Sequence, residues 1–348
     1  MTLTRWVLPF LFLSFNPATT GLFADVVLFG SGANQFSIDF ATIGSPGNPA
    51  DTTGFPASPY PTGSVGYTYY MSKFEISEEM IVKYNASYGV ANNAQITYLA
   101  RSADKPVTGI SWNDAARFVN WLNLLVGSPV AYRFQGSDID ISRWSRRDTP
   151  DDWDANNPYR SKRAMFALPT TNEWYKAAYY SPSTGGYYNY GTGTDQSPTA
   201  IVSGKGTNTS VYNNSQATGP AAITNAGSVN EYGIMAMSGN VHEWMESAIP
   251  SITAADSQPG SARVIRGGSW MSSLDQIDNL HNFSSTPTGT FEHVGFRIIS
   301  LSSQNFQPAG ETSVPEPSTC LLLTCVTAYG SIRCRRRARE QKLAAVQN

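Results

Sequence analysis

The positions of the cysteines place the strongest constraint on how this chain can fold. The 348 residues contain three cysteines, Cys320, Cys325 and Cys334, and all of them lie in the last 29 positions. The body of the chain, residues 25–305, therefore has no thiol for a disulfide or a cysteine-ligated metal site. It must be stabilised by burial of side chains, for which the 41% hydrophobic content of the chain is sufficient.

The composition of the body indicates a loop-rich, acidic domain. Charged residues make up only 14% of the chain, and 29 glycines and 21 prolines predict many turns between short elements. The net charge is −2, but segment 333–348 carries +5 and Arg5 adds +1, which leaves −8 for residues 25–332. An acidic body argues against nucleic acid as a partner.

Residues 1–24 have the layout of a secretory signal peptide. Arg5 precedes an apolar run at 6–15, and small or polar residues follow as far as Ala24. Cleavage is expected after Ala24, with Ala18 as the competing site. The alternative, a buried first strand, is disfavoured because two prolines interrupt the segment.

The C-terminus indicates a second sorting signal. Val-Pro-Glu-Pro-Ser-Thr at 314–319 precedes an apolar run at 320–332 and an arginine cluster. This arrangement resembles the PEP-CTERM signal of Gram-negative bacteria, which is handled by an exosortase and implies the outer envelope, the cell surface or the extracellular matrix. As a helix the apolar run would span about 20 Å of a hydrocarbon layer of about 30 Å, which favours transient membrane association. A peripheral anchor is the alternative.

The body contains no low-complexity break and no repeat of fixed period, so a single domain is predicted. The predicted organisation is a signal peptide at 1–24, a domain at 25–305, a linker at 306–314, a sorting signal at 315–339 and a tail at 340–348.

Capping patterns predict three helices within the body. Ser111 with Asp114 and Thr170 with Glu173 have the pattern of a capping box, and Ser77 precedes two glutamates in the first turn of a further helix. Apolar spacing predicts a buried face at Ala115, Phe118, Val119 and Leu122, and another at Trp174, Ala177 and Ala178. The polar segment 137–163 between these two helices is interpreted as a surface insertion.

Five short segments occur in a fixed order along the body. They are Lys73–Ser77, Pro106–Trp112, Leu168–Trp174, Ser238–Trp244 and Arg266–Trp270, the last closed by Gly295–Arg297. In this order they resemble the motifs of the formylglycine-generating enzyme family, also called sulfatase-modifying factors. The resemblance implies an α+β fold related to C-type lectins, rich in irregular structure, with a surface cleft.

The resemblance also shows which chemistry is missing. The enzymes of this family carry two cysteines after the Gly-Gly-Ser-aromatic motif, and the thiolates hold copper that activates oxygen. Here those positions are Ser272 and Ile277. Neither side chain offers the soft ligand that Cu(I) requires, so copper and the family reaction are not expected. Ser269 and Ser272 are kept as candidate ligand-binding residues.

Calcium is the one cofactor that the resemblance implies. The family's calcium loop corresponds to Gly239, Val241 and Glu243, and a second segment corresponds to Asn213 and Asn214. Calcium takes six to eight oxygen ligands, and a Gly-Asn turn exposes carbonyls beside the glutamate carboxylate. In the alternative reading the turn is only structural, the glutamate caps the backbone and the following tryptophan fills the core.

Ligand recognition is predicted in the window 271–294. The same fold serves as a ligand-binding scaffold in retroelement-diversified proteins, in which the variation lies between the two motifs that bound this window. Phe283 and Phe291 are the candidate anchors, because aromatic residues tend to carry binding energy. The competing interpretation places both phenylalanines in the core.

No independent catalytic set is evident. The histidines, His242, His281 and His293, are not in a recognisable metal-binding spacing. We therefore expect an exported, envelope-associated, non-catalytic binding or scaffolding module whose ligand is a protein or polysaccharide at the cell surface. One alternative is a formylglycine-generating-type oxidase, or another metal-dependent oxidoreductase, that acts through unidentified residues. The other is a structural component of an exopolysaccharide matrix.

Overall fold

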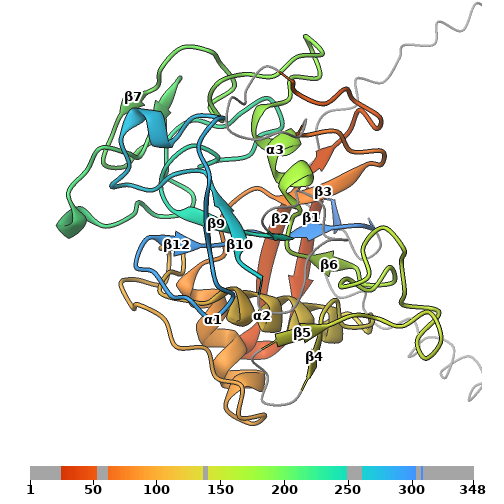
Figure 1. The fold of residues 1–348 in the computed structure, drawn as a ribbon. Helices are drawn as coiled ribbons and strands as arrows, with labels where there is room; N and C mark the ends of the chain where they lie inside the picture. The colour runs from red at the N-terminus through yellow and green to blue at the C-terminus, as the bar shows by residue number, and fades with distance from the viewer. Residues whose placement is uncertain (1–24, 53–61, 136–139, 249–260, 303–306, 309–348) are drawn as a thin grey trace, which may run out of the picture. The chain divides into compact units, whose positions relative to one another are not determined.

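The computed structural model describes residues 25–52, 62–135, 140–248, 261–302 and 307–308 (Figure 1). The predicted signal peptide and the predicted C-terminal sorting signal lie outside these ranges. The chain divides into two compact units at residues 1–307 and 308–348, and the description below concerns the first of them.

A six-stranded sheet brings the two ends of the body together. Its order is β14-β1-β2-β3-β13-β6. The strands are β1 (Asp25–Phe29), β2 (Phe36–Ile43), β3 (Tyr69–Ser72), β6 (Phe166–Ala167), β13 (Ile299–Ser300) and β14 (Gln307–Pro308). Ile299 lies opposite both Met71 and Ala167, in antiparallel pairs. Strand β13, near the end of the body, therefore lies between β3 and β6.

A four-stranded sheet frames the predicted recognition window. Its order is β11-β10-β9-β12, so β11 and β12 are its edge strands among the strands described. The strands are β9 (His242–Ala248), β10 (Arg263–Arg266), β11 (Phe283–Ser285) and β12 (Val294–Gly295). The window leaves β10, returns as β11 and ends at β12, which pairs in parallel with β9. Two-stranded sheets are formed by β4 (Arg133–Gln135) with β5 (Asp140–Ser142) and by β7 (Thr199–Ala200) with β8 (Thr209–Ser210).

The three predicted helices are confirmed at their caps. They are α1 (Glu78–Tyr84), which continues into a π-helical turn at Asn85–Gly89, α2 (Trp112–Leu125) and α3 (Thr171–Tyr179). Ser111 and Thr170 both complete capping boxes, and Ser77 caps α1 through its hydroxyl. The predicted apolar faces of α2 and α3 are buried. Within the described ranges, no helix is long and apolar enough to cross a bilayer.

Much of the core is formed by two clusters rich in aromatic residues, one around α1 and α2 and one around α3. Helices α1 and α2 lie together, whereas α3 lies apart from them and contacts β9 (Figure 1). In the α1–α2 cluster, Trp121 stacks on Phe36 with ring centroids 5.6 Å apart and meets Tyr84 edge-on at 5.3 Å. Around α3, Tyr175 and Tyr179 pack edge-to-face at 4.8 Å. Three helices and many short strands separated by irregular stretches make this an α+β fold, as predicted.

The interpretation of 137–163 as a surface insertion is wrong for part of this segment. Tyr159 and Ser161 are buried, and Arg160 is only 8% exposed. The indole N–H of Trp144 donates to the carbonyl of Ala131 at 3.1 Å, which holds the segment against the body. The polar composition was misleading because a buried charge is tolerated when it has charged partners, and Arg160 has two.

Candidate functional site

Residues from several of the ordered motifs meet in one buried ion pair. The carboxylate of Glu243 on β9 accepts hydrogen bonds from Nε and Nη2 of Arg297 at 2.6 and 2.7 Å. It also accepts one from the indole N–H of Trp174 at 2.6 Å. All three side chains are fully buried. Motif residues that are far apart in the sequence thus form the polar centre of the fold.

A second carboxyl group belongs to the same centre. Glu75 accepts from the side-chain amide of Asn240 at 2.6 Å and from the backbone N–H of Val241 at 3.2 Å. The amide oxygen of Asn240 accepts from the backbone of Ala221 at 2.8 Å, so the Asn240 side chain is held on both sides. Burial, followed by the nearby charge of Glu243, raises the pKa of Glu75 to about 8. Near neutral pH, Glu75 is therefore mostly protonated and adds no second negative charge to the Glu243–Arg297 ion pair.

The raised pKa of Glu75 predicts that the body loses stability as the pH rises. The folded state holds this proton up to about pH 8, whereas an unfolded glutamate loses it near its ordinary value of 4.5. Between these values the folded state binds more protons, so the free energy of unfolding falls by at most about 1.4 kcal/mol per pH unit from this group. Denaturant unfolding of wild type and Glu75→Gln from pH 4.5 to 8.5 tests this. The slope should be shallower in the variant, and equal slopes would contradict the assignment.

The residues around Glu243 do not fit a calcium ion held by its carboxylate. Both oxygens already accept from Arg297, and a cation would have to displace the guanidinium. Asn213 and Asn214 donate their backbone N–H groups to the carbonyls of Ser272 and Trp270, at 2.9 and 2.8 Å. No group of three or more histidine, cysteine or acidic residues suited to a metal occurs in the described ranges. Calcium binding by the body, at Asn213 and Asn214 or at the carbonyls of the 239–243 loop, stays a prediction.

The loop that contains the candidate calcium ligands Gly239 and Val241 is hydrogen-bonded to two other segments of the chain. The Gly239 N–H donates to the carbonyl of Gly267, and the Asn240 N–H donates to the carbonyl of Val211 at 2.8 Å. Val241 is fully buried. This matches the alternative reading of a structural turn, with the difference that Glu243 pairs with Arg297 instead of capping the backbone.

The two positions that the resemblance assigns to the family's cysteines lie in successive turns of the chain, closed by Ser272 N–H to Ser269 and by Ile277 N–H to Leu274. Ser272 is 4% exposed, and its hydroxyl accepts from the backbone N–H of Ser269 at 2.9 Å. Ile277 is fully buried against Gly268, whose φ of 75° and close packing leave no room for a side chain. The expectation that Ser269 and Ser272 contact a ligand is not supported by this geometry, because both side chains are buried and lie 3.4 Å from each other.

A cavity of about 130 Å³ opens beside the edge strand β11, within the predicted window. We call it the His–Phe cleft. Its lining consists of His242, Ile265, Phe283, Ser284, Ser285, Phe291, His293 and Val294. The structure thus brings the two predicted anchors, Phe283 and Phe291, into one site, and it leaves Ser269 and Ser272 outside the lining.

Two of the three histidines, His242 and His293, line this cleft, and His281 packs on the ring of Phe283, which sequence reasoning did not predict. The ring of Phe283 meets His281 edge-to-face with centroids 4.5 Å apart, and meets His242 at 5.0 Å. His242 in turn lies 5.4 Å from His293. The signal was hidden because the pairing of β12 with β9 brings positions 242 and 293 together, and no local spacing reveals it.

The cleft has no formal charge near neutral pH. Burial lowers the pKa of His242 to about 3, and the neighbouring His293 and His281 add to the effect. Burial also lowers the pKa of His293, although Glu292 opposes this shift. The Nε2 atom of His281 and the Nδ1 atom of His293 are buried and have no hydrogen-bond partner in the described part of the chain. The cleft is therefore lined by two uncharged imidazoles, and that of His293 has a nitrogen without a partner among the described residues.

The two phenylalanines differ in their surroundings. Phe283 is 39% exposed, so it is not a core residue. Phe291 is partly buried and packs toward Trp244 at the border of the α1–α2 cluster, with ring centroids 6.4 Å apart. The interpretation that both are core residues is therefore wrong for Phe283.

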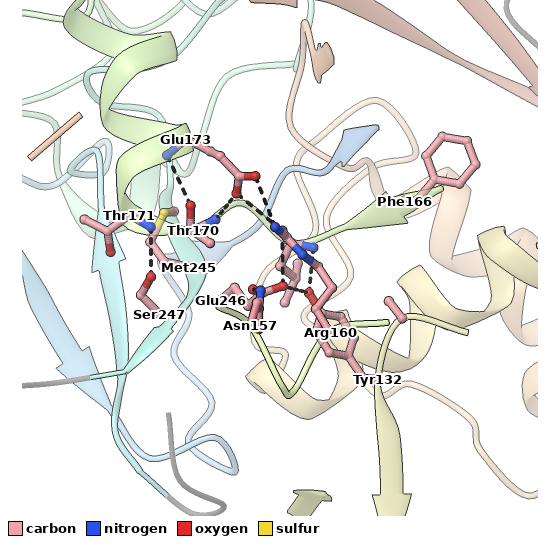
Figure 2. A network of polar contacts seen from close by, with 12 residues as sticks. Tyr132, Asn157, Arg160, Phe166, Thr170, Thr171, Glu173, Met245, Glu246 and Ser247 are labelled. Carbon is pink, nitrogen blue, oxygen red and sulfur yellow. Dashed lines mark hydrogen bonds and ion pairs between the residues drawn. The ribbon is translucent and has the colours of Figure 1, made fainter. Parts of the chain in front are cut away.

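A separate buried ion network links α3 to β9 (Figure 2). Arg160 lies between Glu173 on α3 and Glu246 on β9, with N–O distances of 3.3 and 3.5 Å. Tyr132 and Asn157 both donate to the Glu246 carboxylate at 2.6 Å. The carboxylates of Glu173 and Glu246 are both paired in this network, and the buried amide oxygen of Asn157 has no partner among the described residues. None of these residues lines the His–Phe cleft, so we assign the network a structural role.

Comparisons with known proteins agree with this architecture. Residues 26–301 match the family model described as sulfatase-modifying factor enzyme 1-like domain. Among solved structures, Treponema denticola variable protein 1 aligns with a TM-score of 0.52 at 20% identity, over 79% of this chain and 98% of that one. The structure titled CarF aligns with a TM-score of 0.54 at 19% identity, over 76% of this chain and 98% of that one. No curated protein matched the chain.

Proposed function

We propose that this chain, which belongs to the sulfatase-modifying factor enzyme 1-like domain family, is a ligand-binding module that lacks the cysteine-based chemistry of the family's enzymes. The observation that carries the proposal is the His–Phe cleft. It is a formed cavity with an exposed aromatic ring, and it lies in the window where ligand recognition was predicted.

The state of the cysteine positions supports a role without oxidation. Ser272 and Ile277 are buried in a packed turn, and neither supplies a soft ligand for copper. Both are held by their neighbours, Ser272 by a hydrogen bond to Ser269 and Ile277 by contact with Gly268. Ser272 and Ile277 therefore contribute to the packing of the fold.

We place this module outside the cytoplasm, in the envelope or on the cell surface. The proposal is supported by the signal-peptide pattern of residues 1–24 and by the resemblance of residues 315–339 to a PEP-CTERM signal. Intact-mass measurement of the protein from its native host tests it. A product that starts near Asp25 supports export, and a full-length cytoplasmic product contradicts it.

The purified body is expected not to convert cysteine to formylglycine in a sulfatase-type peptide, with or without added copper. The reason is that no thiolate pair is present at 272 and 277 to hold Cu(I). Mass spectrometry of the peptide after incubation measures the outcome, with an enzyme of the family that has both cysteines as positive control. Copper-dependent aldehyde formation by this chain would overturn the proposal.

A second experiment tests the binding role directly. The purified body is applied to arrays of cell-surface glycans and of envelope proteins, and each ligand found is tested against Phe283→Ala. The variant should lose binding while it keeps the melting temperature of the wild type, because Phe283 is 39% exposed. Val82→Ala, an exposed apolar residue on α1, is the matched control and should bind normally. Ligands that bind Phe283→Ala unchanged would place recognition elsewhere.

A further inference from the structure

We infer that the His–Phe cleft binds a single neutral, hydroxyl-bearing ring, namely one glycosyl unit of a polysaccharide. This inference rests on the proposed binding function and names the class of ligand for that site. Three properties of the cleft carry it: the absence of charge in its lining, the open aromatic ring of Phe283, and the polar groups of the lining, namely the unpaired nitrogen of His293 and two serine hydroxyls.

The lining selects against charged ligands. Its eight residues include no acidic side chain, lysine or arginine, and its two histidines are neutral near pH 7. Glu292, next to His293, is not part of the lining, and its carboxylate accepts from the side-chain amide of Gln216 at 2.7 Å. A charged group that entered the cleft would lose its hydration and gain no opposite charge, which is unfavourable. The ligand that fits is therefore neutral.

Phe283 provides a fixed platform for the face of a ring. Two imidazoles hold it edge-to-face, at centroid distances of 4.5 and 5.0 Å and interplanar angles of 74° and 85°. Since these contacts set the orientation of the ring before a ligand arrives, little side-chain entropy is lost on binding. Part of the ring stays accessible, and the C–H groups of a sugar face pack well on such a surface.

The polar groups of the lining distinguish a sugar from a purely apolar ligand. The Nδ1 atom of His293, which lines the cleft, is buried and has no partner among the described residues. A hydroxyl group both donates and accepts, so it can pair with this nitrogen in either neutral tautomer. The hydroxyls of Ser284 and Ser285 lie in the same lining. An aliphatic side chain of a peptide would leave these groups unpaired.

The size and position of the cleft agree with one ring of a longer chain. Its volume of about 130 Å³ is close to that of cavities that admit one benzene ring, about 150 Å³. Strand β11 is one of the two edge strands of its sheet among the described strands. One ring can therefore enter the cleft while the rest of the polysaccharide continues along the surface.

Titration followed by NMR tests the inference. The probes are neutral hexose tetrasaccharides of differing linkage, with tetrasaccharides of uronic acids and a tyrosine-containing peptide for comparison. We expect at least one neutral tetrasaccharide to shift the ring signals of His281 and His293. We expect its affinity to fall at least tenfold in Phe283→Ala, and also in Phe283→Leu, which keeps apolar volume without the aromatic face. Val82→Ala should bind as the wild type does.

Several outcomes would overturn the inference. Histidine ring signals that do not respond to any neutral tetrasaccharide would do so, as would equal or tighter binding of the uronic acids. A response that persists in both Phe283 variants, with melting temperatures unchanged, would remove the cleft as the site. If an envelope protein or the tyrosine peptide binds in a Phe283-dependent manner while the sugars do not, the inference fails and the proposed binding function stands.

Discussion

Replacing Glu243 by glutamine is expected to lower the free energy of unfolding by about 3–5 kcal/mol, because the change leaves the Arg297 guanidinium buried without its counter-ion. Arg297 would keep its hydrogen bonds to the carbonyls of Ser72 and Met235, each at 3.0 Å, but these do not neutralise its charge. Glu79→Gln is the matched control. That glutamate is 56% exposed and pairs with Lys83 one turn away, so its loss should cost about 0.5 kcal/mol or less.

The nearby Glu75 gives this prediction a second readout. Glu243 is one of the groups that raise the pKa of Glu75, and Arg297 acts in the opposite direction. In Glu243→Gln the pKa of Glu75 should therefore fall, and the pH dependence of stability between 4.5 and 8 should weaken. Urea unfolding at several pH values measures both effects. A loss below about 1 kcal/mol, or an unchanged pH dependence, would show that the ion pair is not the centre of the fold.

The helices could be predicted from the sequence because their signals are local. The capping boxes at Ser111 and Thr170 lie within four residues, and the spacing of apolar residues after them defines a face. The same applies to the cap at Ser77. Such signals do not depend on any part of the chain that is distant in sequence.

The role of the ordered motifs could not be predicted in the same way. Glu243 had the chemistry of a calcium ligand, and only the fold shows that Arg297, 54 residues later, occupies its carboxylate. Glu75 lies 166 positions from the backbone N–H of Val241 that it accepts from. Charge pairing over such separations is set by the topology of the sheets, and one sequence does not reveal it.

Part of the lining of the candidate site was identified from the sequence. The window 271–294 and the two phenylalanines were identified from the motifs at its ends, and the structure places both rings at one cleft. Ser269 and Ser272 are buried and lie outside this lining, which the sequence did not indicate. The histidines were missed because the parallel pairing of β12 with β9 brings them together.

The prediction that 137–163 is a surface insertion was wrong at Arg160, because its charged partners are also distant in sequence. Replacing Arg160 by methionine is the second change for which a large loss of stability is expected. Arg160 is the cation between Glu173 and Glu246 (Figure 2). Burial alone would raise the pKa of Glu173, but Arg160 and the hydroxyl of Tyr67 hold it below its ordinary value. Burial raises the pKa of Glu246, although Arg160 opposes this shift.

Arg160→Met should therefore cost about 3–5 kcal/mol near pH 8, where two buried carboxylates are left without their cation. Burial then raises the folded-state pKa of both groups above the unfolded value, so the folded state binds more protons and stability falls as the pH rises. The loss should be clearly smaller at pH 5, because protonation removes part of the uncompensated charge.

Urea unfolding of wild type and Arg160→Met at pH 5 and pH 8 measures this difference. Arg163→Met is the matched control, since Arg163 is 49% exposed and pairs with Asp152 at 2.9 Å, and its effect should be much smaller. Equal losses at the two pH values would mean that Arg160 acts through packing of its side chain and not through its charge. A loss no larger than that of the control would mean that segment 137–163 contributes little to the stability of the fold, in contradiction to the buried network.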